Sequence, residues 1–409
     1  MKKKLPKEKK TSDFRLVGVL AGALILAVIF ITAIILTTPA ESGTAGLENE
    51  IRIGAIYNLN GSQSSLDIPS ARGAQIAVDA INENGGVDGK TVRLVLYDGR
   101  TNTSDIRAAA SRLVQEDDVV AIIGMSDTDM VIPAAETAAG SGTVFVTSGA
   151  TSPLLPEKVP GYLYLACFGD NAQAAAAAEF ARSDLNATTA FVVTDRSMEY
   201  TRLLSRYFEE RFTGAGGTVT GTMNYSGTTW DNGTFFAGSG ISGSSPDVVF
   251  VACGPENCGN VTHAIRAAGI SAPVLGGDSF DFPGLAADAG ADAGRIFYTT
   301  HADISTSSGD PNMTDFISRY TKKYNEKPNA FAALGYDTVN VVVKAARFSP
   351  SSTDLREGLW SISGYDGLTG TISYANRSYV PQKSVTILEL RNGIVVSHGE
   401  RILQEVAAP

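Results

Sequence analysis

Cysteine, histidine and charged side chains are all scarce in this chain of 409 residues. Three cysteines are too few for a disulfide-stabilised scaffold. The three histidines lie far apart in the sequence, so no metal-ligand spacing is present. No Ser-His-Asp set and no phosphate-binding glycine loop occurs either. The sequence therefore predicts a protein that is not an enzyme and that needs no metal or organic cofactor.

The cysteines leave one pairing open. Cys253 and Cys258 are close enough in sequence to form a disulfide, provided that a strand end and a helix start bring them together. Two buried free thiols are an equally good interpretation. The third, Cys167, has no neighbour in sequence with which to pair.

Charge is unevenly distributed along the chain. The net charge is -10, but residues 1–40 carry seven Lys/Arg and only two Asp/Glu. The remainder is strongly acidic, which argues against a nucleic-acid-binding surface. We therefore expect no nucleic-acid partner.

The basic N-terminal end (1–15) precedes an uncharged run from Leu16 to Leu36. A run of 21 apolar or small residues is long enough to cross a bilayer, and preceding basic residues place the N-terminus in the cytoplasm. We interpret 16–36 as a membrane anchor, followed by a tether (37–50). A cleaved signal segment ending near Ala40 is the alternative. In both cases the body lies outside the cytoplasm.

Asn-x-Ser/Thr frames support an extracellular body, because eight of them occur. Glycosylation is the natural reading of the set, which comprises Asn60, Asn102, Asn186, Asn224, Asn232, Asn260, Asn312 and Asn376.

The body alternates short apolar runs with amphipathic stretches, a pattern that predicts α/β lobes with doubly wound parallel sheets. No linker divides the chain, so two lobes with the chain passing between them fit best. We assign 51–168 with 300–369 to the first lobe and 169–299 with 370–398 to the second. Residues 399–409 form a tail. Asn392-Gly393, between two alternating runs, predicts a hairpin near the end.

Two stretches suggest where a ligand binds. Ala121–Pro133 and Thr143–Pro153 each begin as a buried strand and then break into Ser, Thr and Gly. The carboxyl edge of a parallel sheet is where small ligands bind, and hydroxyls with free N–H groups favour an anion such as a carboxylate. Ordinary turns whose Ser and Thr cap helices are the plainer interpretation.

The loops of the two halves differ in chemistry. The first offers hydroxyls, backbone donors and an apolar contact, at Leu66, Ser126, Thr128, Gly149 and Thr151. The second offers acids and an aromatic ring, at Asp170, Tyr200, Gly254 and Asp278. Donors facing acids suit a zwitterion, with its carboxylate on the hydroxyls and its ammonium on Asp278 or Asp170. The alternative interpretation of these side chains is structural: Asp170 caps a helix, and Tyr200 and Phe331 belong to the hydrophobic core.

Seven short stretches follow one another in a familiar order: Arg72–Gly89, Tyr97-Asp98, Ile123-Gly124, Thr147–Pro153, Asp170-x-x-Gln173, Arg266–Gly269 and Gly335-Tyr-Asp337. In this order, from about Ile51 to Ser397, they resemble the branched-chain amino-acid-binding protein family. Its members are solute receptors of ABC importers with the type I periplasmic-binding-protein fold. The resemblance implies two α/β lobes joined by three crossovers, with the ligand held between them.

The resemblance also assigns roles to residues. Thr128, Gly149 and Thr151 would grip the α-carboxylate and ammonium, Tyr200 and Asp278 would close over the ligand, and Asp170 would lie near the hinge. Where family members often have an aromatic residue this chain has Leu66 and Gly254, and where glutamate is frequent it has Asp278. Gly254 would leave space for a bulkier ligand.

The leading hypothesis is a monomeric extracellular receptor that closes on an amino acid, branched-chain or otherwise aliphatic, and delivers it to an ABC permease. The alternative is a ligand-sensing or interaction module that uses the same clamshell for another small carboxylated or amide solute. About fifteen residues precede the apolar run, too few for a signalling domain.

Overall fold

The structure of the protein is a computed structural model that describes residues 49–227, 234–290, 294–305, 309–348, 355–403 and 408. The basic end, the apolar segment 16–36 and nearly all of the tether lie outside these ranges, as do Asn232 and residues 404–407 and 409 of the tail. In the described part, no helix is both long enough and apolar enough to cross a bilayer. Residues from Ile51 onward form one unit, which contains two α/β lobes.

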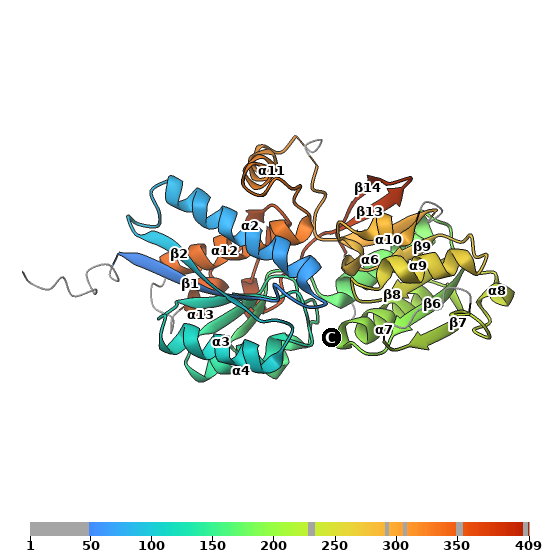
Figure 1. The fold of residues 1–409 in the computed structure, drawn as a ribbon, viewed down its shortest axis with the longest axis horizontal. Coiled ribbons are helices and arrows are strands. Elements are labelled where there is room, and N and C mark those ends of the chain that lie inside the picture. Colours follow the sequence, from blue (N-terminus) through green and yellow to red (C-terminus); the bar gives the residue numbers. More distant parts are fainter. Residues whose placement is uncertain are drawn as a thin grey trace, which may run out of the picture. The chain divides into compact units, whose positions relative to one another are not determined.

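The first lobe is built on a five-stranded sheet in the order β2-β1-β3-β4-β5 (Figure 1). Its strands are β1 (Glu50–Tyr57), β2 (Thr91–Asp98), β3 (Ala121–Gly124), β4 (Val144–Thr147) and β5 (Leu163–Leu165). β1, β3, β4 and β5 pair in parallel, as predicted. Its other elements are α2 (Ser64–Glu83), α3 (Thr103–Gln115), α4 (Val131–Gly140), α5 (Leu155–Lys158), α11 (Pro311–Tyr324), α12 (Ala330–Phe348), α13 (Leu355–Trp360), β11 (Tyr365–Gly367) and β12 (Gly370–Ile372).

The second lobe is built on a seven-stranded sheet in the order β14-β13-β10-β9-β8-β6-β7. Its strands are β6 (Thr189–Asp195), β7 (Thr218–Tyr225), β8 (Val248–Ala252), β9 (Val274–Gly276), β10 (Ile296–Thr300), β13 (Val385–Arg391) and β14 (Ile394–Arg401). β6 to β10 pair in parallel, and β13 and β14 add the predicted antiparallel hairpin. Its helices are α6 (Asp170–Ser183), α7 (Glu199–Gly214), α8 (Ile241–Ser244), α9 (Cys258–Ala267) and α10 (Leu285–Ala289), with a 3-10 turn η1 (Asp278–Phe280).

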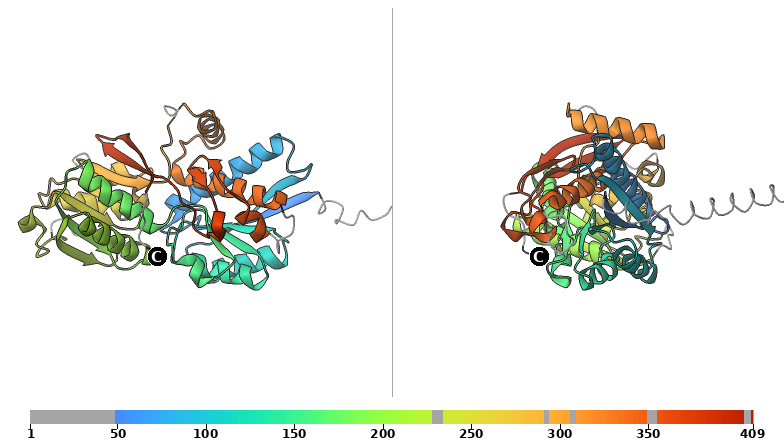
Figure 2. Two further views of the ribbon diagram at one scale, coloured as in Figure 1. Left: turned by 180° about the vertical axis from the view of Figure 1, so that it is seen from behind. Right: turned by 90° about the vertical axis from the view of Figure 1, so that its left-hand side faces the viewer.

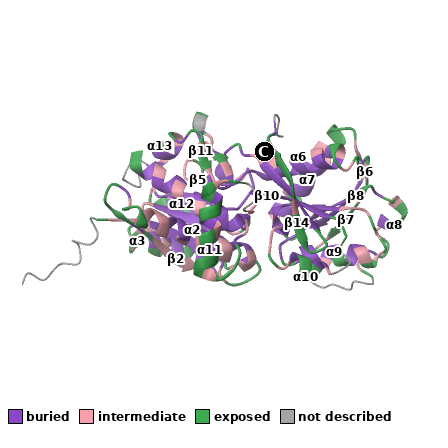
Figure 3. Cartoon of the chain, turned by 90° about the horizontal axis from the view of Figure 1, so that it is seen from above, coloured by how far each residue is buried: buried purple, intermediate pink, exposed green. Residues whose placement is uncertain are grey.

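Each sheet is apolar on both faces because helices cover both faces (Figure 2). In β1, Ile53 and Ala55 pack in one cluster with α2 and α12, whereas Ile56 packs in another with α3 and α4. This is the period-2 alternation of a strand buried on both sides. Figure 3 shows the buried strands inside each lobe and the largely exposed β14, which is the edge strand of the second-lobe sheet.

Two glycines set the packing of α2 against α12. A Cβ at Gly73 would lie 1.8 Å from the Ala332 carbonyl oxygen, and one at Gly335 would lie 1.9 Å from the Ser70 carbonyl oxygen. The backbones of the two helices therefore touch, and a side chain at either position would separate them.

The chain crosses between the lobes three times: after β5, after β10 and before β13. The third crossing differs from the predicted boundary at 369/370. β12 pairs with β11, and Ile372 and Tyr374 lie in the core of the first lobe, so the chain crosses only shortly before Val385. The predicted tail also begins too early, because β14 continues to Arg401 along its partner strand.

Candidate functional site

A narrow cavity of about 20 Å³ lies between the lobes, at the carboxyl ends of their strands. Eight predicted ligand-binding residues line it: Leu66, Ser126, Thr128, Gly149, Thr151, Tyr200, Asp278 and Phe331. Five further lining residues were absent from the predicted set: Gln63, Asp127, Met198, Pro255 and Ser279. A wider open hollow of about 690 Å³ lies against the second and third crossovers, and none of the predicted site residues lines it.

The first-lobe wall presents hydroxyls without partners. Ser126 Oγ and Thr128 Oγ1, in the loop that follows β3, are buried and have no hydrogen-bond partner among the described residues. Buried polar atoms are nearly always satisfied, so an orphaned pair in a cavity points to a ligand that accepts hydrogen bonds there. Gly149 keeps this wall open, because a Cβ there would lie 2.9 Å from Ser126 Oγ.

Asp67, in the first turn of α2, holds that loop in place. Its carboxyl accepts the Asn58 N–H at 2.7 Å and the Ser126 N–H at 2.8 Å. Burial raises the pKa of Asp67 to about 7, although both hydrogen bonds oppose the rise. Asp67 thus fixes the orientation of the loop that carries Ser126 and Thr128, although Asp67 itself does not line the cavity.

The second-lobe wall is organised around Asp278, the first residue of η1 after β9. Its Oδ1 accepts the Tyr200 hydroxyl at 2.8 Å and the Gln173 amide at 3.1 Å. Its Oδ2 lies 3.0 Å from His301 Nε2. Three donors therefore fix the carboxylate, while a carboxylate has about four acceptor positions. One position on Oδ2 is left for a ligand.

His301 connects Asp278 to the crossovers. The imidazole is buried, stacked on Phe168 with ring centroids 3.9 Å apart, and edge-on to Phe331 at 5.7 Å. Burial lowers the pKa of His301, and the hydrogen bond to Asp278 opposes that change. Since Phe168 and His301 belong to two different crossovers, the acid of the site is tied directly to the hinge.

Asp170 does not line the cavity and lies at the first crossover, where the resemblance placed it. It is the first residue of α6, its N–H donates to the Thr151 carbonyl oxygen at 2.8 Å, and its Oδ1 accepts the Gln173 amide at 3.0 Å. Burial raises its pKa to about 8, and hydrogen bonds from Thr151 and Gln173 oppose that rise. Asp170 therefore positions Thr151 and Gln173 at the first crossover.

A family sequence model described as periplasmic binding protein matches residues 50–393. The chain belongs to the periplasmic binding protein family. A relative, Leu/Ile/Val-binding protein homolog 3 of Brucella melitensis, is 24% identical over 370 residues, which cover 88% of this chain and 98% of the relative. The Leu/Ile/Val-binding protein BraC3 of Rhizobium johnstonii is 24% identical over 356 residues, covering 85% and 94%.

Two solved structures are also similar to this periplasmic binding protein. The branched-chain amino acid transporter substrate binding protein LivJ of Streptococcus pneumoniae, in complex with isoleucine, has a TM-score of 0.78 and 26% identity, covering 87% of this chain and 99% of that one. The leucine binding protein LivK of Thermotoga maritima has a TM-score of 0.76 and 27% identity, covering 86% and 98%. The type I periplasmic-binding-protein fold expected from the sequence is thereby confirmed.

Gly254 differs from its prediction, since it neither lines the cavity nor leaves free space. A Cβ there would lie 2.9 Å from a Glu256 carboxylate oxygen and 3.1 Å from Met198 Sδ, so these side chains fill the position. The same loop contains a disulfide between Cys253 and Cys258, whose Cα atoms are 5.5 Å apart. The cavity wall here is therefore made by Met198 and by Pro255, which lies between the paired cysteines.

Asp127 places an acid on the first-lobe wall, between the hydroxyls of Ser126 and Thr128. Its side chain is buried, and its Oδ1 accepts the Asp129 N–H at 2.9 Å. Burial raises its pKa to about 7, and the charges of Asp129, Asp67 and Glu256 add to the rise. Protonation of this carboxyl near neutral pH would allow a ligand carboxylate to bind beside it.

Proposed function

We propose that this periplasmic binding protein is the solute receptor of an ABC importer, and that it binds an amino acid, branched-chain or otherwise aliphatic, between its lobes. One observation carries the proposal: the hydroxyls of Ser126 and Thr128, which have no hydrogen-bond partner in the described part of the chain, line the same cavity as the carboxylate of Asp278 from the opposite lobe. An α-amino acid brings an acid for the first wall and an ammonium for the second.

The apolar lining favours an aliphatic side chain. Leu66, Met198, Pro255 and Phe331 contribute carbon surface to the cavity. The similarity to LivJ with isoleucine and to the leucine binding protein LivK supports the same class of ligand. Hinge closure would remove the ligand from water, and the closed form would dock on the permease as a monomer.

Isothermal titration calorimetry of the purified protein with leucine, isoleucine, valine, alanine and their deaminated analogues tests the proposal. We expect tight 1:1 binding of at least one aliphatic amino acid and much weaker binding of its deaminated analogue. Heats indistinguishable from dilution for the whole panel would refute the ligand assignment.

We further propose that residues 16–36 anchor the protein in the membrane with its body outside the cytoplasm. The intact mass of the protein recovered from membranes tests this, because cleavage after Ala40 would remove the basic end and the apolar run together.

Six of the eight Asn-x-Ser/Thr asparagines are exposed and Asn260 is half-buried, which supports glycosylation of the body. A fall in mass after glycosidase treatment is the expected result.

A further inference from the structure

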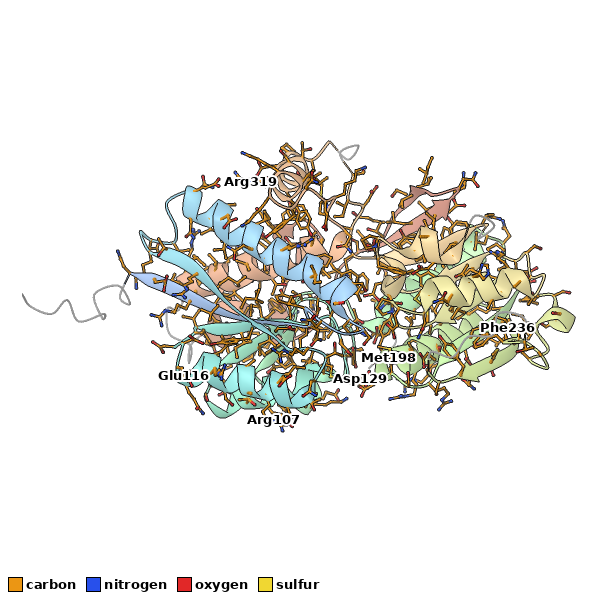
Figure 4. All side chains as sticks on the ribbon, in the orientation of Figure 1. Arg107, Glu116, Asp129, Met198, Phe236 and Arg319 are labelled. Atoms are coloured by element: carbon orange, nitrogen blue, oxygen red, sulfur yellow. A yellow bond between two sulfur atoms is a disulfide. The ribbon has the colours of Figure 1, made fainter. Side chains whose placement is uncertain are left out.

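Helix α7 of the second lobe begins without a cap of its own. Met198, at the N-cap position, makes no side-chain hydrogen bond to the helix. Instead, Asp129 of the first lobe accepts the Glu199 N–H, at 2.9 Å to Oδ2 and 3.2 Å to Oδ1. Figure 4 shows Asp129 and Met198 together where the lobes meet. The next residue of α7, Tyr200, lines the cavity and holds Asp278.

Helix α12 of the first lobe also meets the second lobe at its first turn, although it has a cap of its own in Asn329. Asp281 of the second lobe is buried, its Oδ2 accepts the Thr300 hydroxyl at 2.5 Å, and its carboxyl lies beside the Ala330 N–H, the first of α12. Asn329, which caps α12 through the Ala332 N–H, donates its amide to the Asp281 carbonyl oxygen at 3.2 Å. The next residue of α12, Phe331, lines the cavity and packs against His301.

The stability of the first turn of α7 depends on the opposite lobe, because its cap comes from there. The first N–H groups of a helix have no partner within the helix, and a side-chain cap is worth about 0.5–2 kcal/mol. When the cap belongs to the opposite lobe, that energy is gained only while the lobes are together. Lys158 of the first lobe adds an ion pair with Glu199 at 2.7 Å, but both side chains are partly exposed, so we assign it little weight.

We propose that Asp129, as a cross-lobe cap of α7, and Asp281, as a cross-lobe contact at the start of α12, set the ligand affinity of this protein by stabilising the closed arrangement. Neither residue lines the cavity. Their effect is therefore on the equilibrium between open and closed lobes, which scales the affinity for every ligand by the same factor. The inference rests on the proposed function, in that the ligand binds between the lobes.

The test compares Asp129→Ala and Asp281→Ala with the wild-type full chain, using calorimetry and stopped-flow dissociation of leucine. From the worth of a cap, Asp129→Ala should weaken binding by about 2- to 30-fold, mainly by faster dissociation. Asp281→Ala should weaken binding in the same way. Asp129→Asn should restore most of the affinity, because an amide oxygen also caps a helix. The same fold-change should appear for isoleucine and valine.

A matched control is Asn102→Ala, which removes a cap from α3 within the first lobe. It is compared with the wild type after glycosidase treatment of both proteins, because Asn102 also belongs to a proposed glycosylation frame. Asn102 accepts the Ser104 and Asp105 N–H groups and is exposed, away from the cavity. We expect lower thermal stability and unchanged affinity for this variant. Equal dissociation rates for wild type, Asp129→Ala and Asp281→Ala would overturn the proposal.

A second measurement is independent of ligand identity. The double variant Asp129→Ala/Asp281→Ala should have a larger radius of gyration than the wild type in small-angle X-ray scattering without ligand, whereas Asn102→Ala should not. If no amino acid binds the wild type, the proposed function fails, and scattering alone decides whether these two residues hold the lobes together. Superimposable scattering curves would refute the proposal that Asp129 and Asp281 hold the lobes together.

Discussion

Substitution Asp278→Asn tests the ammonium site most directly, because it removes a charge with almost no change of shape. Asp278 accepts the Tyr200 hydroxyl and the Gln173 amide on Oδ1, so an asparagine oxygen can take that position. Its amide would then face His301 Nε2. His301 Nδ1 has no hydrogen-bond partner among the described residues, so the imidazole can move its proton there and accept from the new amide. We therefore expect the variant to fold.

The variant should lose affinity for leucine, because the ammonium group of the ligand is left without its anionic partner. Truncating one partner of a buried, hydrogen-bonded charge pair costs about 2–5 kcal/mol, which is roughly a 30- to 4,000-fold loss of affinity for leucine. The deaminated analogue, 4-methylpentanoate, has no ammonium, and its affinity should change little or improve. Calorimetry of both ligands with both proteins gives a complete thermodynamic cycle, which isolates the interaction between Asp278 and the ligand ammonium. An equal loss for the two ligands would show that Asp278 shapes the cavity and does not bind an amine.

Three further outcomes are expected. Thr128→Val should weaken leucine binding by roughly 10- to 150-fold in calorimetry, since a hydrogen bond to a charged group is worth about 1.5–3 kcal/mol, while the melting temperature does not fall. Unchanged affinity would remove Thr128 from the site. Gly277→Ala should lower both affinity and melting temperature, because its Cβ would lie 2.4 Å from the Tyr200 hydroxyl oxygen; wild-type values for both would contradict this. The free energy of unfolding without ligand, from urea titrations, should fall as pH rises from about 5 to 8. In that window the folded chain keeps protons on Asp67 and Asp170, whose pKa values are raised to about 7 and 8, which the unfolded chain has released. Stability that rises over this window would refute the assignment.

The fold was predictable because its signals are local. Short apolar runs that alternate with amphipathic stretches specify strands and helices, and the buried strands predicted at the start of Ala121–Pro133 and Thr143–Pro153 are β3 and β4. The carboxyl ends of parallel strands meet at one edge of a sheet, so the loops bearing Thr128 and Thr151 could be placed together from chain order. That Asp278 faces them from the other lobe was implied by the family resemblance.

The support around the site was not predictable, because it depends on contacts between distant parts of the chain. Gln173 and His301 hold Asp278 across 105 and 23 positions, and a lone histidine carries no signal in the sequence. The cap that Asp129 provides to Glu199 spans 70 positions and two lobes. At Gly254 the residue type indicated open space, but whether neighbouring side chains fill that space is decided by packing.

The backbone contact of α2 with α12 at Gly73 and Gly335 has a consequence for ligand capture. Leu66 near the start of α2 and Phe331 near the start of α12 cannot move apart while that contact holds, so half of the binding surface is preorganised before any solute arrives. Little conformational entropy is then lost in assembling it, and the binding free energy goes mainly into swinging the other half into place.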